Sequence, residues 1–397
     1  MFRKITRTVW LLSIVSLMND FSSEMLYPII PLFLQQIGYS TVLIGILEGV
    51  AELIAGLSKI YMGSVSDSFQ RRLPFVNIGY SLSVLSRPLI GLTSFIGFVF
   101  LGRSMDKIGK GIRTGARDAL LAEECNEENR AEVFGFHSSM DTVGAILGPL
   151  VAIIYLYFNP EDYRTIFIIA LAPGLIAAIV TFFVKEKKRD TVPERNFSLQ
   201  KNFSFYKVAS KEYLLFTGLF LVFGLVNSSD MFLLLRAKEA GISESHVIFL
   251  YILFNLVYSL FAFPIGKLAD RYGRMRMMIL GLLIYAVTYF VFGLSSNPFM
   301  IGTAFIGYGL YYAFTRSTLK AILLQHVLTS QKSSAVGFFE GLNSFCLLAA
   351  NAIAGFVWYR YGSVTMFLAT GIIVLVVIIL LVIKRNHIRP NIKQPID

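Results

Sequence analysis

Charged side chains recur at helical spacing inside long apolar stretches of this sequence. Asp20 and Glu24 are four residues apart, and Arg103, Lys107 and Lys110 follow one another at spacings of four and three. Residues three or four apart lie on one face of a helix, so each set forms a polar stripe. A carboxylate in apolar surroundings can take up and release a proton, and lysine or arginine can bind an anionic group. The spacing therefore indicates proton transfer and ion pairing.

The elements that carry these residues are predicted to be transmembrane helices. The 397-residue chain is 55% hydrophobic and only 15% charged, whereas charged residues make up about a quarter of a soluble domain. Apolar runs of roughly 20 residues, the length that spans a bilayer, recur along the whole chain. We predict twelve helices at residues 9–36, 41–63, 74–95, 96–117, 133–157, 165–184, 213–235, 246–266, 277–294, 299–320, 334–358 and 364–383.

The net charge of +11 does not indicate a nucleic-acid partner, because the basic residues are distributed as membrane topology requires. Lysine and arginine collect in segments 185–201 and 267–276, whereas the loops on the opposite side hold few of them. This asymmetry places both termini and the middle loop in the cytoplasm. We expect a multi-pass protein of the bacterial cytoplasmic (inner) membrane, surrounded by lipid bilayer, monomeric, and without a cleavable signal peptide.

The chain divides into two similar halves. A polar, basic linker at residues 185–211 separates an N-terminal six-helix bundle, residues 1–184, from a C-terminal six-helix bundle, residues 212–397. A glycine, an aspartate and an arginine recur at the same spacing after the second and the eighth helix: Gly63, Asp67 and Arg71, and Gly266, Asp270 and Arg274. Ser22 to Met25 in the first helix also matches Ser228 to Met231 in the seventh. These matches indicate a duplicated unit.

The repeated loop resembles the signature loop of the major facilitator superfamily. Gly144, Gly148 and Pro149 in the fifth helix are similar to a motif of its antiporters, although the glycines that usually follow Pro149 are replaced. The stretches MNDFSSEMLYP and DKIGKGIRTGARDALLA resemble a recurring bacterial subgroup. The resemblance implies an all-α membrane fold of two pseudo-symmetric six-helix bundles, with the repeated loops as a cytoplasmic gate motif and helices 1, 4, 7 and 10 lining a central cavity.

Ionisable side chains within the bilayer are costly, so each is a functional candidate. The proton-coupling candidates are Asp20, Glu24, Asp106 and Asp230, and the substrate-binding candidates are Arg103, Lys107, Lys110 and Arg316. If the four helices line one cavity, these charges converge there. The structural alternative for Arg103, Lys107 and Lys110 is a salt-bridge network with Asp20 and Glu24.

These features predict a secondary active transporter that moves a small organic solute by alternating access, with proton-coupled export as the first hypothesis. Proton-coupled uptake of an organic anion or a siderophore-like chelate is the alternative, and a passive channel or a membrane sensor is the alternative from another class. A Walker A motif is missing from the sequence, as are GxSxG and HExxH motifs, so we expect no ATP hydrolysis, no enzyme activity, no cofactor and no metal site.

Overall fold

The computed structural model describes residues 5–67, 69, 71–125, 129–186, 204–325, 327 and 332–384. Within these ranges all regular structure is helical and no β-strand occurs. A helix satisfies its backbone hydrogen-bonding groups internally, as a chain in hydrocarbon requires. By length and composition, six helices of this part of the chain are apolar enough to cross a membrane. The helix at residues 96–123 is not among the six, because its charged stripe makes it less apolar.

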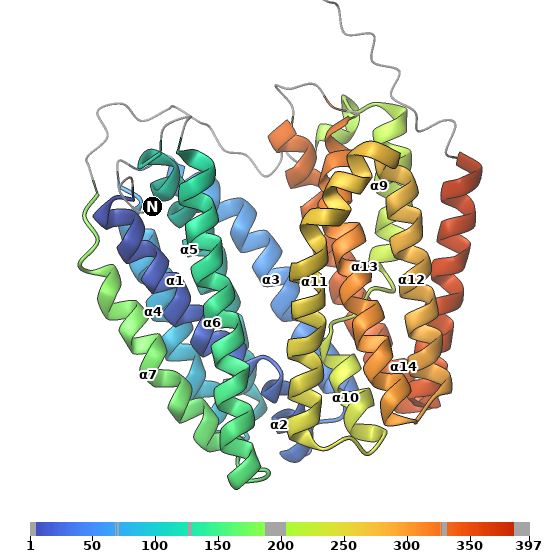
Figure 1. Cartoon of the computed structure of the whole chain (residues 1–397), viewed down its shortest axis with the longest axis horizontal. Coiled ribbons are helices and arrows are strands. Elements are labelled where there is room, and N and C mark those ends of the chain that lie inside the picture. The colour runs from blue at the N-terminus through green and yellow to red at the C-terminus, as the bar shows by residue number, and fades with distance from the viewer. Residues whose placement is uncertain are drawn as a thin grey trace, which may run out of the picture. The chain divides into compact units, whose positions relative to one another are not determined.

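The described residues of the N-terminal part form seven helices. They are α1 (Arg7–Leu26), α2 (Ile29–Gln36), α3 (Thr41–Asp67), α4 (Leu73–Gly91), α5 (Ile96–Glu123), α6 (Arg130–Phe158) and α7 (Tyr163–Thr181) (Figure 1). The predicted first helix, 9–36, is therefore two helices. Pro28 lies at the junction, and a proline has no N–H with which to continue the hydrogen-bond ladder.

The described residues of the C-terminal part contain a short 3-10 helix and six α-helices, of which the last is double. They are η1 (Ser204–Lys207), α9 (Lys211–Gly224), α10 (Met231–Glu239), α11 (Glu244–Tyr272), α12 (Arg274–Leu294), α13 (Pro298–Gln325) and the doubled α14 (Lys332–Lys384). Gly362 divides α14 into two helices, since its φ of 86° and ψ of 162° are not helical. Glycine tolerates this positive φ because it has no Cβ.

The predicted seventh helix, 213–235, is wrong as a continuous element. Helix α9 ends at Gly224 and α10 begins at Met231, and residues 225–230 between them are not helical. This segment reads Leu-Val-Asn-Ser-Ser-Asp. Asn, Ser and Asp side chains compete with the backbone for hydrogen bonds, which opposes helix formation. The seventh span is therefore two half-helices joined by a polar break.

The chain forms two compact units. The first comprises Met1–Tyr39, Val50–Phe197 and Glu244–Phe249, and the second comprises Ser40–Gly49, Ser198–Ser243 and Leu250–Asp397. In the first unit α1 packs against α6 and α7, and α4 packs against α5 and α7. In the second unit α12 packs against α13 and α14, and α9 packs against α14.

Two glycines of α6 let its backbone approach that of α1. A Cβ at Gly144 would collide with the backbone of Leu17 and Phe21, and one at Gly148 would collide with the backbone of Phe21 and Met25. Small residues permit such close helix packing in membranes. Pro149 lies within α6 without ending the helix. These contacts fix α1, and with it Asp20 and Glu24, against α6.

Candidate functional site

The basic stripe of α5 lies in the first unit and is engaged with acidic groups. Lys107 is 8% exposed, and its Nζ lies 2.5 Å from Oε1 of Glu52 in α3. Arg103 is 3% exposed, and its Nη1 lies 4.0 Å from Oδ2 of Asp106, one turn further along α5. A buried side chain can stay ionised when a group of opposite charge lies beside it. Two predicted substrate-binding residues therefore make ion pairs within this unit.

The predicted carboxylates of α1 lie close to the next base of the stripe. Lys110 is exposed, and Asp20 and Glu24 are among the charged groups that lie near it. Asp20 also has Asp141 of α6 as a near neighbour. The structure thus brings three predicted residues, Asp20, Glu24 and Lys110, into one neighbourhood.

A histidine and a carboxylate of α6 extend this neighbourhood. Nε2 of His137 lies 3.7 Å from Oδ2 of Asp141, and its Nδ1 is 3.3 Å from the hydroxyl of Ser13 in α1. His137 is buried. Neither His137 nor Asp141 is among the predicted site residues, although their spacing of four residues places them on one helix face.

The second unit contains a separate polar cluster around Asp230. The hydroxyl groups of Tyr308 and Tyr312 in α13 donate to Oδ1 of Asp230 over 2.5 Å and 3.1 Å. Arg316, one turn further along α13, is exposed and places its guanidinium 4.9 Å from the ring centre of Tyr312. Such a geometry is a cation–π contact. Two predicted residues, Asp230 and Arg316, are therefore connected through Tyr312.

The tyrosines of this cluster are absent from the sequence prediction. Tyr308, Tyr312 and Arg316 follow one another at spacings of four residues, which places all three on one face of α13. That spacing is the signal that could have identified them. The site candidates thus fall into two groups, one in each unit, and their convergence on a single cavity stays a prediction.

The two copies of the cytoplasmic gate motif are described to different extents. In the second copy Nη2 of Arg274 lies 2.9 Å from Oδ1 of Asp270, and Gly273, with φ of 98°, ends α11 between them. Gly266 lies in α11. In the first copy Arg71 is exposed, whereas the side chains of Gly63 and Asp67 lie outside the described residues, as does most of the predicted linker.

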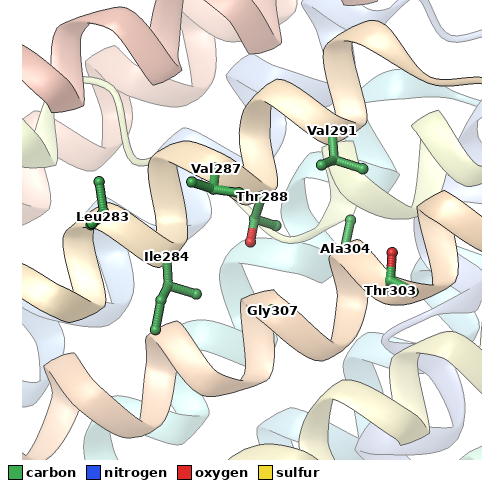
Figure 2. Close-up of a pocket in the computed structure, with 8 residues that line it drawn as sticks. All are labelled: Leu283, Ile284, Val287, Thr288, Val291, Thr303, Ala304 and Gly307. Atoms are coloured by element: carbon green, nitrogen blue, oxygen red, sulfur yellow. The ribbon is translucent and has the colours of Figure 1, made fainter.

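A groove of about 320 Å³ lies between α12 and α13, and none of these charged residues lines it. Its lining includes Leu283, Val287 and Val291, and Figure 2 shows the hydroxyls of Thr288 and Thr303 as its few polar groups. Its apolar lining offers no counter-ion to a charged solute. Among the described residues no cluster of His, Cys, Asp and Glu could hold a metal ion.

Comparison with known proteins identifies the family. The family model for the Major Facilitator Superfamily matches residues 12–236 and 215–396. An uncharacterized MFS-type transporter of Methanocaldococcus jannaschii is 32% identical over 376 residues, covering 91% of this chain and 93% of its own. The multi-drug resistance efflux pump PmrA of Streptococcus pneumoniae is 22% identical, covering 89% and 90%.

A solved structure shows the same fold at low sequence identity. The crystal structure of the nucleoside transporter NupG superposes with a TM-score of 0.82 at 15% identity, covering 95% of this chain and 99% of NupG.

The chain belongs to the major facilitator superfamily of transporters. The predicted fold class is confirmed: an all-α membrane protein of twelve transmembrane helices in two six-helix bundles. It is a multi-pass membrane transporter rather than an enzyme.

Proposed function

We propose that this transporter exports a small organic solute in exchange for protons by alternating access. The observation that carries the proposal is the neighbourhood of Asp20, Glu24 and Lys110 in the first unit. A carboxylate within a membrane costs about 3 kcal/mol when charged and unpaired, so it gains either a proton or a partner of opposite charge. Lys110 is such a partner, and binding of a proton would release the lysine.

In this mechanism Asp20 or Glu24 loads a proton from outside and releases it to the cytoplasm. Solute and proton compete for the same carboxylates. The site therefore carries the solute in one direction and the proton in the other. Alternating access would come from rocking of the two bundles, as in other transporters built from repeats, and the gate motif with Asp270 and Arg274 would close the cytoplasmic side. The 22% identity with an efflux pump supports export.

Uptake of an organic anion or a siderophore-like chelate together with protons is the second candidate. The basic stripe of α5 favours it, because Arg103, Lys107 and Lys110 would attract a negatively charged solute. Under this alternative the anion would displace the acidic partners Glu52 and Asp106 from their bases. Asp106 and Asp230 stay proton-coupling candidates under either direction.

The proposed setting is the cytoplasmic membrane of a bacterium, with both termini in the cytoplasm and the monomer as the working unit. The basic linker and the basic loop 267–276 support this orientation.

The test is transport in proteoliposomes with an imposed pH gradient. Amphipathic cations, nucleosides and organic anions are offered to the wild type, Asp20→Asn, Glu24→Gln and the double variant. We expect saturable, gradient-dependent flux of one solute class in the wild type, and loss of gradient dependence in the double variant. Flux that neither saturates nor depends on a gradient indicates a channel, and unchanged proton coupling in the double variant removes the proposed carriers.

A further inference from the structure

Buried side-chain oxygen atoms lie in the break between α9 and α10. Ser228 is 4% exposed, and its Oγ has no hydrogen-bond partner of normal geometry among the described residues, with the Tyr289 phenol as its neighbour. The buried Oδ1 of Asn227 also has no hydrogen-bond partner among these residues. Burying such atoms without a partner costs free energy. A folded segment that keeps two of them within one short stretch therefore points to a ligand that satisfies both.

One tyrosine of α12 lies beside the break, and a second tyrosine stacks on it. Tyr289 is fully buried, and its phenol lies beside Ser228 and near Asp230. The ring of Tyr289 stacks on that of Tyr285 with centroids 4.1 Å apart. The phenol oxygens of both residues also lack a hydrogen-bond partner of normal geometry in the described part of the chain.

Hydrogen bonds with neighbouring helices fix the conformation of the break. Oδ1 of Asn351 in α14 accepts a hydrogen bond from the backbone N of Ser229 over 2.8 Å, and Nδ2 of Asn351 donates to the carbonyl of Leu347 over 2.9 Å. The carboxylate of Asp230 is oriented by Tyr308 and Tyr312. The oxygen atoms are thus positioned by the fold, as a preorganised site requires.

We propose that the break binds one sodium ion, held by Oδ1 of Asn227, Oγ of Ser228, the Asp230 carboxylate and main-chain carbonyls at the end of α9. All of these are oxygen ligands, which suit hard cations. The Asp230 carboxylate supplies the negative charge of the site. The C-terminal end of α9 carries the negative pole of the helix, and unwound backbone with half-helix C-terminal ends coordinates Na⁺ in other transporters.

The duplicated half of the chain supplies a contrast. Ser22 of α1 is the counterpart of Ser228 in the sequence repeat, but it lies within a continuous helix and its hydroxyl donates to the carbonyl of Ala170 in α7. The first unit therefore satisfies its serine internally, and the sodium site belongs to the second unit alone. The inference does not depend on Asp20 and Glu24, the proton carriers proposed above, and it gives Asp230 the role of a sodium ligand.

The test is thermal unfolding of the full-length protein, purified in detergent and followed by tryptophan fluorescence. Sodium chloride replaces choline chloride at constant total salt and constant pH, with potassium chloride as a second comparison. A ligand that binds only the folded state raises the apparent melting temperature. We expect a saturable rise with Na⁺ in the wild type, and no rise with K⁺.

The rise should be lost in Ser228→Ala, Asn227→Ala and Asp230→Asn, each compared with its own melting temperature in choline. It should persist in the matched control Ser22→Ala and in Asp20→Asn. The two Asn227 and Ser228 variants act independently, so failure of one to fold leaves the other as the test. A flat response of the wild type to Na⁺, an equal response to K⁺, or a full response in Ser228→Ala overturns the sodium site.

Binding of radioactive ²²Na⁺ to the same proteins gives a second readout. The wild type and Ser22→Ala should bind about one ion per chain, as one carboxylate allows, and the Ser228 and Asn227 variants should bind far less. Loss of proton coupling in Asp20→Asn with Na⁺ binding intact would support both proposals. If the wild type binds Na⁺ but shows no proton-coupled transport, the exchange mechanism is contradicted and the sodium site is still supported.

Discussion

The ammonium group of Lys107 lies 2.5 Å from the carboxylate of Glu52, and the pair joins α5 to α3 in the interior of the first unit. Lys107 has only 10% of its side chain exposed, whereas Glu52 has 32%. Lys107 therefore depends on its partner more than Glu52 does, because a buried charge without a partner is costly.

Glu52→Gln should lower the apparent melting temperature, with a cost of up to about 3 kcal/mol, because it leaves the Lys107 charge buried and unpaired. Lys107→Met should cost less, since Glu52 is less buried than Lys107 and can bind a proton. The double variant should recover part of the loss. Thermal unfolding of the four proteins measures this as a double-mutant cycle, and additive losses would show that the two residues do not interact.

The close approach of α6 to α1 predicts a steric effect at Gly148. An added methyl group meets the backbone of Phe21 and Met25, so Gly148→Ala should destabilise the protein by about 1–3 kcal/mol. The matched control is Gly135→Ala on the same helix, where a Cβ would have no described neighbour within 4 Å. That control should be neutral or stabilising by up to about 1 kcal/mol. Equal melting temperatures for the two variants would contradict the packing described for α1 and α6.

We expect the ion pair of the gate motif to contribute little to stability and much to transport. Asp270 and Arg274 are solvent-accessible, so Asp270→Asn should change stability by less than about 1 kcal/mol. If the pair closes the cytoplasmic side, transport should nevertheless fall several-fold in proteoliposomes. The exchanged variant Asp270→Arg with Arg274→Asp keeps the ion pair and should recover part of the flux. Full transport by Asp270→Asn would remove the pair from the gate.

Asp162 lies in the loop before α7, outside the membrane-spanning segments. We expect it to make a pH-dependent contribution to the stability of the fold. The hydroxyl of Tyr155 donates to Asp162 over 2.6 Å, and together with Thr165 it holds the pKa of Asp162 below its usual value. A carboxylate with a lowered pKa stabilises the fold above its unfolded pKa of about 3.9, and this stabilisation is lost as the pH falls through the folded pKa.

Asp162→Ala should therefore lower the melting temperature at pH 7, with a cost of about 1 kcal/mol for the lost helix cap. The difference from the wild type should narrow below pH 4. Tyr155→Phe should remove part of the same pH dependence, because it deletes the donor and keeps the ring. A constant difference between pH 3 and pH 7 would show that the charge of Asp162 contributes nothing.

Helical spacing was enough to predict much of this molecule. The polar face of α5 followed from the positions of Arg103, Lys107 and Lys110 alone, and the repeat placed Asp270 and Arg274 after the eighth span. The ion pair of Lys107 with Glu52 could not be assigned in this way, because the partners are far apart in the sequence and their pairing depends on how α3 packs.

The region around Asp230 was the least predictable part. The apolar residues on both sides of it favoured one continuous helix, whereas the polar residues at 227–230 break the span in two. The contact of Asp230 with Tyr308 depends on tertiary structure, and tyrosine in an apolar helix is consistent with simple packing. Charged residues stand out in an apolar helix because placing a charge in lipid costs much free energy. The tyrosine hydroxyl groups that bind them do not stand out in the sequence.

The central claim, that carboxylates of α1 exchange protons for solute, is tested most directly by recording proton movement when solute is added. Proteoliposomes containing a pH-sensitive dye receive a transported solute without an imposed gradient. The wild type should move protons against the solute, and Asp20→Asn with Glu24→Gln should exchange solute while moving none. Solute transport by the wild type without proton movement, or unchanged proton movement in the double variant, would contradict the account.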